Sequence, residues 1–324
     1  MCGPQFPVVP TARDMRALSA VLDPTPAFGH SVARVLPSEL PPDAQLDALQ
    51  EQIDALSFEI SALRRRDAQV HGVINRLDEE QRLAARLQQD FLPKRLPQLG
   101  GIHFHTLYRP AAYVSGDLYD VMRLDETNVG FYVADAVGHG MPAALLTMFM
   151  KNALVTKSIS ADAAGGAYAL LEPAQTIGRL NTSLCQQDLS HATFATAIYG
   201  RIDATTLRMR FSTGGHPNPV VLRDGTLREL PCCGALLGIF PTEVFDTADV
   251  QLHPGDRVFV YTDGIEVAFA DTTPTDPDRW KDELLARRDW PTDRILSDFA
   301  DRLDACNGSL LPRDDLTIVA IEIT

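Results

Sequence analysis

The sequence is poor in cysteine and in basic residues, and each of these scarcities argues against a class of protein. Only five cysteines and two tryptophans occur among its 324 residues. The cysteines form neither a CxxC motif nor an even set, which indicates free thiols in a reducing cytosol; they are Cys2, Cys185, Cys232, Cys233 and Cys306. Lysine and arginine total 29 against 43 acidic residues, a net charge of −14. This balance argues against nonspecific binding to nucleic acid and to anionic membranes.

Long apolar runs are also missing. No stretch approaches the roughly 18 residues of a membrane helix. The first residues, MCGPQFPVVP, lack the basic start and apolar core of a secretion signal. We therefore expect a cytoplasmic protein without a membrane segment. With 45% hydrophobic residues the chain can bury a substantial core, and its length suits one large domain or two of about 100–200 residues.

The N-terminal third has two parts with different patterns. Residues 1–42 are rich in proline, which blocks helix interiors, so a flexible tail is expected. Residues 43–92 follow a 3-4 apolar spacing, which predicts a coiled-coil helix for dimerisation or signalling. The seam begins Leu46, Leu49, Ile53, Leu56, Ile60, Leu63, and polar residues interrupt it at Asp67, Gln81 and Gln88. The alternative is an amphipathic helix packed on its own domain, which normally shows a wider apolar stripe.

From about Ile102 the hydrophobic period is two, and turn signals separate short strands. A buried strand over 129–134 runs into a glycine-rich loop, and helices are expected from Pro142 to Lys151 and over 173–185. Asp224-Gly225 predicts a two-residue hairpin turn, and LTIVAIEI closes the chain as a strand. Many strands without regular βαβ alternation predict an α+β domain of antiparallel sheets over residues 93–324.

Acidic residues lie at the ends of several expected strands. Asp117 is in SGDLYD, Asp135 ends GFYVAD, Asp263 ends RVFVYTD, and Asp314-Asp315 precede the last strand. Taken singly, each is an ordinary turn or cap residue, as aspartate commonly is. Converging carboxylates repel one another unless a cation neutralises them. An oxygen-only set suits Mg²⁺ or Mn²⁺.

Seven blocks of sequence occur in an order that resembles a known family. They are SGDLYD, VADAVGHGMPAALLT, FATAIYGRID, TGGHPNPVVL, LLGIFP, GDRVFVYTDGI and RDDLTIVAI. Together they resemble the SpoIIE/RsbU-type branch of the metal-dependent PPM (type 2C-like) serine/threonine phosphatases, over about residues 92–324. The preceding QQDFLP resembles the segment that leads from helix into that domain.

The resemblance implies an αββα sandwich of two antiparallel sheets, with a centre of two Mn²⁺ or Mg²⁺ ions between them. Carried over by motif, the ligands and catalytic residues are Asp117, Asp135, Asp263 and Asp314, and Ala136 adds its backbone carbonyl. Asp120 and Asp315 fit as outer supports of the ligands. His139 and His216 belong to glycine-containing loop motifs, for which structural roles are favoured.

The sequence departs from the family pattern after TDG. Glu266 arrives one place early, and the loop Asp271–Asp278 lacks the usual Phe-Gly element. This departure bears on substrate selection and leaves the ligand positions intact.

By resemblance, the expected activity is hydrolysis of phosphoserine or phosphothreonine, on a STAS-type anti-anti-sigma factor in bacterial partner switching. The expected assembly is a homodimer through the coiled coil, with higher order left open. One alternative is a catalytically idle scaffold with a structural metal site. Another is a phosphatase for a small phosphorylated molecule.

Overall fold

The computed structural model describes residues 41–159, 168–187, 194–269, 278–306 and 314–324. The proline-rich tail up to residue 40 and residues 271–277 of the departing loop lie outside the described residues. The chain divides into two compact units, residues 1–74 and 75–324. The division falls inside helix α2 (Pro42–Phe91), whereas the sequence analysis placed the boundary at residues 92 and 93.

Helix α2 exposes most of its apolar seam. Leu46, Ile53 and Ile74 are 69%, 53% and 54% exposed. Its last turns, which belong to the second unit, differ, since Gln88 is only 2% exposed.

No helix in the described residues is long and apolar enough to cross a membrane.

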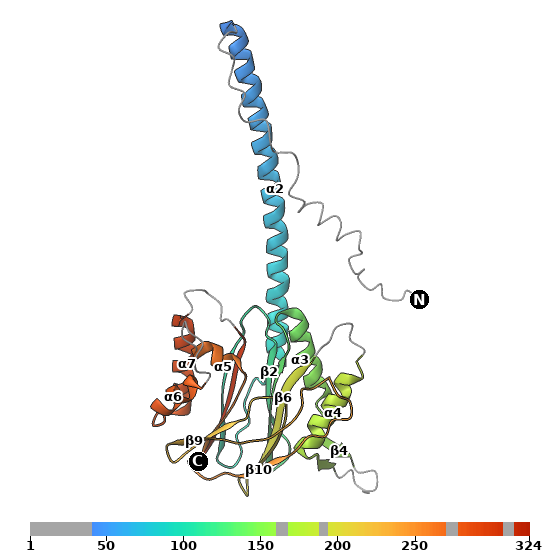
Figure 1. Ribbon diagram of the computed structural model, residues 1–324, viewed down its shortest axis with the longest axis vertical. Helices are drawn as coiled ribbons and strands as arrows, with labels where there is room; N and C mark the ends of the chain where they lie inside the picture. Colours follow the sequence, from blue (N-terminus) through green and yellow to red (C-terminus); the bar gives the residue numbers. More distant parts are fainter. Residues whose placement is uncertain (1–40, 160–167, 188–193, 270–277, 307–313) are drawn as a thin grey trace, which may run out of the picture. The chain divides into compact units, whose positions relative to one another are not determined.

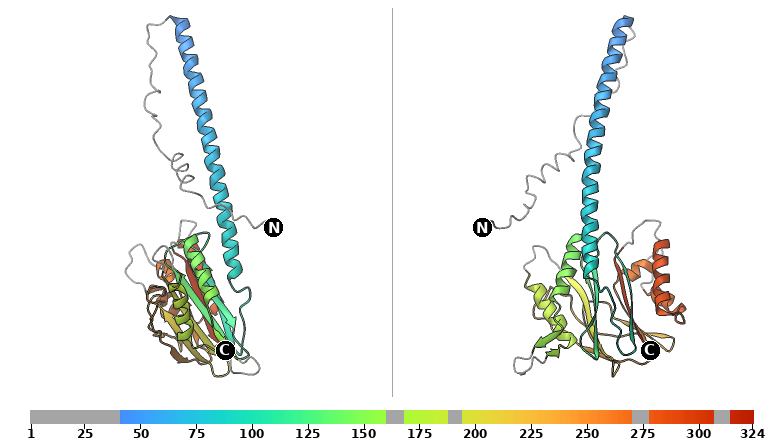
Figure 2. Two further views of the ribbon diagram at one scale, coloured as in Figure 1. Left: turned by 90° about the vertical axis from the view of Figure 1, so that its right-hand side faces the viewer. Right: turned by 180° about the vertical axis from the view of Figure 1, so that it is seen from behind.

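The second unit is built on two five-stranded antiparallel sheets (Figures 1 and 2). Sheet A contains, in spatial order, β1 (Ile102–Arg109), β12 (Leu316–Ile323), β11 (Arg257–Tyr261), β8 (Val220–Arg223) and β9 (Thr226–Glu229). Sheet B contains β10 (Ala248–Gln251), β7 (Arg208–Gly214), β6 (Ala195–Asp203), β3 (Asn128–Ala136) and β2 (Asp117–Arg123). A separate pair joins β4 (Lys157–Ile159) to β5 (Tyr168–Leu170).

The main core lies between the two sheets because alternate residues of each strand face the opposite sheet. On β3, Val129, Phe131 and Val133 belong to this core, and on β12 so do Val319 and Ile321. The intervening residues pack against helices on the outer faces. The expected αββα architecture is confirmed.

Helices cover the outer face of each sheet (Figure 1). Residues of α3 (Met141–Ala153) and α4 (Pro173–Cys185) pack with the outer residues of sheet B. On sheet A the covering helices are α5 (Gly264–Phe269), α6 (Arg279–Ala286) and α7 (Thr292–Cys306). Trp280 of α6 and Phe299 of α7 are fully buried there. Each sheet therefore has its apolar surface covered on both sides.

Local sequence signals place several elements where they were expected. Helix α4 begins with Pro173 and ends at Cys185 as predicted. In the β8–β9 hairpin, Asp224 and Gly225 take φ angles of 50° and 73°, as a tight primed turn requires. Short elements such as β4, β5, β10 and α5 were not anticipated, because three to six residues carry too little periodicity to recognise.

The tight packing between the sheets yields a testable prediction at Gly200. A Cβ there would lie 2.2 Å from the Phe131 ring and 2.9 Å from Phe211 Cβ. Gly200→Ala should therefore destabilise the second unit by about 1–3 kcal/mol. The control is Gly72→Ala on α2, where a Cβ meets nothing within 4 Å, and which should leave that stability unchanged.

Tryptophan fluorescence during urea unfolding measures this effect, because both tryptophans, Trp280 and Trp290, lie in the second unit. Equal unfolding midpoints for the two variants would contradict the packing argument.

Candidate metal centre

Strand pairing brings the first two predicted ligands together. Asp117 begins β2, Asp135 lies near the end of β3, and the two residues are direct partners in the antiparallel register. The next pair on the same face, Tyr119 two residues after Asp117 and Val133 two residues before Asp135, belongs to the core between the sheets. Because side chains alternate along a strand, both carboxylates face sheet A. The pair therefore lies between the sheets, at one end of sheet B.

Asp117 connects the two sheets through hydrogen bonds. Its Oδ2 accepts from Thr262 Oγ1 and from Thr317 Oγ1, each at 2.7 Å. Thr262 follows β11, Thr317 lies on β12, and both are fully buried. Burial chiefly, followed by the charge of Asp135, raises the pKa of the Asp117 carboxyl well above its ordinary value, while these two hydrogen bonds act in the opposite direction.

The other predicted ligands interact electrostatically with Asp135. Burial, followed by the negative charges of Asp263 and Asp314, raises the pKa of the Asp135 carboxyl to about 7. The pKa of Asp314 is also raised, by burial first and then by Asp263 and Asp315, against an opposing hydrogen bond from the Asp315 backbone. Four carboxylates from distant parts of the chain thus share one negative potential, which a cation would relieve.

Asp315 supports the segment that precedes Asp117. Its Oδ1 accepts the Ala111 N–H and its Oδ2 accepts the Gly116 N–H, each at 2.6 Å. A Cβ at Gly116 would lie 3.2 Å from the Ala136 carbonyl oxygen, so glycine permits this close approach. The supporting role expected for Asp315 agrees with these contacts, and the Ala136 carbonyl lies beside the same segment.

Asp120, in contrast, lies on the other side of sheet B. Its Oδ2 is 2.9 Å from Lys151 Nζ of α3. Because Asp120 is an odd number of residues from Asp117, strand alternation directs it to the helix-covered face. The expectation that it supports the ligands is therefore wrong for this residue.

The two loop histidines occupy different environments. His216 is buried, with its Nδ1 2.9 Å from Thr196 Oγ1, and burial lowers its pKa to about 3. The His216 imidazole is therefore neutral at physiological pH. His139 is exposed in the loop after β3, and its charge interacts with Asp314.

Glu266, the residue at the departure from the family pattern, lies in the first turn of α5. Its backbone N–H donates to the Asp263 carbonyl at 2.9 Å. Burial first, and then the charge of Asp263, raises its pKa. The displaced acid therefore still contributes negative potential near Asp263.

The carboxylates suit a hard divalent ion by chemistry and charge. In the described residues, no three acidic, histidine or cysteine side chains are close enough to form a ready-made metal-binding group. The fit rests instead on oxygen donors alone, on their shared location and on the raised pKa of Asp117, Asp135 and Asp314. A bound cation would offset the mutual repulsion of these carboxylates.

Sequence reasoning did not assign a function to Thr262, Thr317 or Gln88. The two threonines were visible inside the motifs YTDG and DDLT, next to predicted ligands. What was not visible is that both hydroxyls converge on Asp117, since this requires the pairing of β11 with β12 and the facing of the two sheets.

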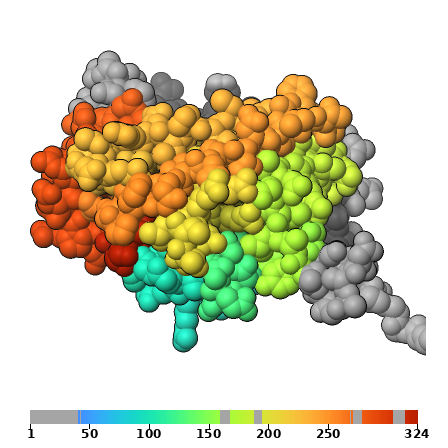
Figure 3. All heavy atoms as spheres, turned by 90° about the horizontal axis from the view of Figure 1, so that it is seen from below, coloured from blue at the N-terminus to red at the C-terminus, as the bar shows by residue number. Residues whose placement is uncertain are grey.

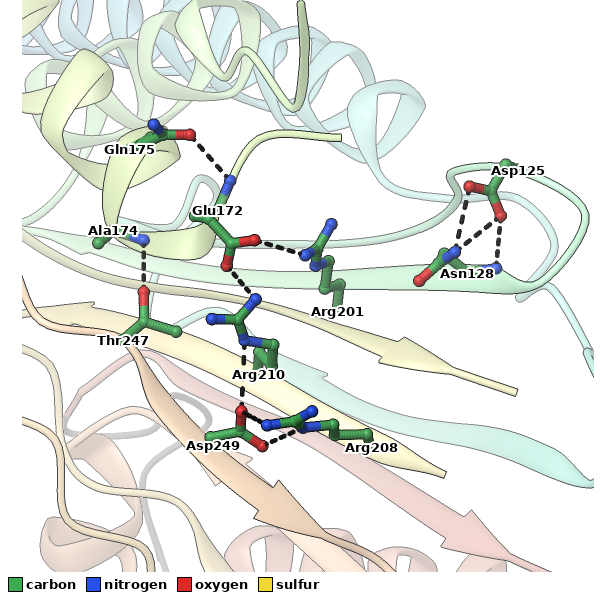
Figure 4. Close-up of polar contacts among 10 residues, drawn as sticks. All are labelled: Asp125, Asn128, Glu172, Ala174, Gln175, Arg201, Arg208, Arg210, Thr247 and Asp249. Atoms are coloured by element: carbon green, nitrogen blue, oxygen red, sulfur yellow. Dashed lines mark hydrogen bonds and ion pairs between the residues drawn. The ribbon is translucent and has the colours of Figure 1, made fainter. Parts of the chain in front are cut away.

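A second polar cluster lies at the opposite end of sheet B, on its outer face (Figure 4). Arg201 and Arg210 are direct cross-strand partners. The Glu172 carboxylate forms an ion pair with each of them, with its Oε1 2.9 Å from Arg201 Nη2 and its Oε2 2.5 Å from Arg210 Nη1. Asp249 accepts two hydrogen bonds from Arg208 at 2.7 and 2.6 Å. The adjoining cavity of about 380 Å³ is lined by Asn128, Arg201, Asp203, Thr206, Arg208 and Arg210.

Each of these guanidinium groups already has a carboxylate partner. The ion pairs of this second cluster connect β6, β7 and β10 to one another and to the start of α4. Figure 3 looks at this end of the unit, where residues of the yellow-to-orange segment after β6 form much of the surface.

Comparison with known proteins agrees with this architecture. Residues 125–324 match the family described as Stage II sporulation protein E (SpoIIE). Phosphoserine phosphatase RsbU of Bacillus subtilis is 26% identical over 198 residues, covering 60% of this chain and 56% of that protein. Phosphoserine phosphatase RsbP of the same organism is 28% identical over 191 residues, covering 57% and 45%. The chain thus spans about half the length of these curated relatives.

Among solved structures, the SiaA-PP2C domain of Pseudomonas aeruginosa superimposes with a TM-score of 0.65 at 23% identity. The match covers 78% of this chain and 99% of that domain. This likeness supports the fold.

The raised pKa of Asp135 predicts how pH affects the metal-free protein. The pKa of about 7 in the fold, against the ordinary aspartate value of 3.8, means that between these pH values the folded state holds a proton that the unfolded state releases. Stability therefore falls as pH rises from about 3.8 to 7. Asparagine does not titrate, so Asp135→Asn removes this loss. The free energy of unfolding of the variant, relative to that of the wild type, should therefore increase by roughly 1–3 kcal/mol between pH 5 and pH 8.

Thermal unfolding in EDTA at several pH values measures this advantage. Asp224→Asn, the same chemical change at an exposed turn, is the control and should show no such trend. An Asp135→Asn advantage that is equal at pH 5 and pH 8 would contradict the electrostatic description of the site.

Proposed function

This chain belongs to the SpoIIE family, and we propose that it is a metal-dependent protein serine/threonine phosphatase of the RsbU-type branch of the PPM phosphatases. The observation that carries this proposal is the facing pair Asp117–Asp135, which shares its negative potential with Asp263 and Asp314. The relatives RsbU and RsbP are both named phosphoserine phosphatases, which supports the same reaction here.

We propose that Asp117, Asp135, Asp263, Asp314 and the Ala136 carbonyl hold two Mn²⁺ or Mg²⁺ ions. Such ions, when bound, supply hydroxide at neutral pH and neutralise phosphoryl oxygens. The protein's part is to orient the ligands. Thr262 and Thr317 restrict the Asp117 carboxylate from sheet A, and Gly116 lets the chain pass close to the Ala136 carbonyl. No nucleophilic cysteine or serine is required.

The substrate proposed from the family resemblance is a phosphorylated STAS-type anti-anti-sigma factor. A phosphorylated small molecule is the alternative substrate, and parallel assays with a phosphorylated STAS protein and with phosphoserine distinguish them. We further propose a cytoplasmic location, which the free thiols of Cys185, Cys232 and Cys233 support.

We also propose that α2 pairs with a second copy of itself. The seam residues Ile53, Leu56 and Ile60 are 53%, 48% and 49% exposed. Burying each such side chain against a partner stabilises by roughly 1.5–3 kcal/mol, which favours a coiled-coil dimer. A parallel homodimer is the simplest arrangement.

The activity proposal predicts a Mn²⁺-dependent hydrolysis of p-nitrophenyl phosphate and of a phosphoserine protein, abolished by EDTA. Asp135→Asn and Asp263→Asn should each reduce kcat/KM more than tenfold, since each removes a ligand charge, and a tenfold loss equals about 1.4 kcal/mol of barrier. Asp120→Asn is the matched control, because it changes the same motif on the face turned away from the site. It should retain most activity.

Activity above a tenth of wild type in either ligand variant would contradict the ligand assignment. Absence of activity in the wild type with every metal and phosphoprotein tested would favour the idle-scaffold alternative, which also expects partner binding to survive Asp314→Ala.

The dimer proposal predicts that replacing Ile53, Leu56 and Ile60 together with Asp yields monomers by light scattering. The control places the same three charges on another face of the helix, at Ala48, Ala55 and Ala62, and should leave the dimer intact. A dimer that survives the seam substitutions would place the interface elsewhere.

A further inference from the structure

Gln88 is the most completely buried side chain of α2, at 2% exposure, although it is polar and occupies a position of the apolar seam. Both ends of its amide are hydrogen bonded to one residue. Gln88 Nε2 donates to the Ser115 carbonyl at 2.7 Å, and the Ser115 N–H donates to Gln88 Oε1 at 2.9 Å. The Gln88 amide therefore provides a hydrogen-bond partner for both the N–H and the carbonyl of Ser115, as the backbone of a neighbouring strand would.

Ser115 in turn contacts the first predicted ligand. Its Oγ accepts the Asp117 backbone N–H at 3.1 Å. The residue between them, Gly116, donates its N–H to Asp315, and its carbonyl accepts from the Ala136 N–H at 3.1 Å. The short segment before Asp117 is therefore hydrogen bonded to Gln88 of α2 on one side and to the carboxylate of Asp315, the residue before β12, on the other.

Two other contacts join this end of α2 to the rest of the second unit. Lys151 Nζ of α3 donates to the Phe91 carbonyl, and the Tyr113 hydroxyl donates to Asp78 Oδ1. Among these, the Gln88 pair is the one that is buried and reaches the residues adjacent to Asp117. A buried amide that lost either partner would leave an unpaired polar group, so this geometry is strongly preferred.

We infer that Gln88 is a positioning residue, which sets the backbone of Ser115–Asp117 so that the Asp117 carboxylate is presented to the metal centre. The inference rests on the proposed function, because Asp117 is assigned there as a ligand. The functional phosphatase unit then includes the last turns of α2, from residue 75, and a fragment beginning at Pro93 keeps every proposed ligand but lacks the residue that positions Asp117.

The experiment compares Gln88→Leu with Gln89→Leu in the full chain. The two residues are neighbours of the same type, but Gln89 is exposed, so the second variant controls for loss of a glutamine amide in this helix. Mn²⁺ alone is titrated into metal-free protein by calorimetry, and p-nitrophenyl phosphate hydrolysis is measured over a range of Mn²⁺ concentrations. Far-UV circular dichroism verifies the fold of each variant.

Gln88→Leu should weaken Mn²⁺ binding at least tenfold relative to Gln89→Leu, and raising Mn²⁺ should recover part of kcat. Equal Mn²⁺ dissociation constants in the two variants would overturn the inference, whatever happens to the melting temperature, because a merely structural amide changes stability without changing metal affinity.

If Gln88→Leu does not fold, Gln88→Glu replaces it under the same criterion, since it keeps the acceptor for the Ser115 N–H and loses the donor. A wild type that binds Mn²⁺ without hydrolysing any phosphoester would refute the proposed function, whereas the comparison of dissociation constants would still decide the role of Gln88.

Discussion

The arrangement of the second unit depends on one buried carboxylate that belongs to one sheet and is hydrogen bonded by the other. Asp117 is 1% exposed, and it accepts from Thr262 and Thr317 across the layer between the sheets. A buried charge without such partners would be strongly destabilising. The two sheets must therefore face each other in one register for the carboxylate to be satisfied, and this register also determines where Asp263 and Asp314 lie.

The same end of the sandwich concentrates charges of one sign, at a cost to stability that the rest of the unit offsets. Burial and neighbouring carboxylates raise the pKa of the Asp135 carboxyl to about 7. At the other end of sheet B, each positive charge is matched, as Glu172 is by Arg201 and Arg210. The candidate site thus differs from this second cluster in gathering carboxylates without basic partners near Asp135, as expected of a place where a divalent cation is proposed.

Helix α2 satisfies two different requirements along its length. Between Leu46 and Leu77 its seam side chains are exposed and suit a second helix. Towards Phe91 the polar seam residue Gln88 pairs with Ser115 of the same chain. The irregularity that weakened the coiled-coil pattern at Gln88 therefore has a physical reason, because that position contacts a backbone segment rather than an apolar partner.

The sequence by itself determined an α+β domain of antiparallel sheets, the bounds of α4 and β12, the hairpin turn at Asp224-Gly225, and, through the order of its motifs, the family resemblance that implies the αββα sandwich. These follow from periodicity, turn chemistry and motif order, which are local or ordered along the chain. Only the tertiary structure decided that Asp120 faces away from Asp117, that two threonines converge on Asp117, and that Gln88 contacts the segment before it. Each of these depends on which strand faces touch and on contacts between residues far apart in sequence, such as the 200 positions that separate Asp117 from Thr317. A one-dimensional pattern does not encode such contacts.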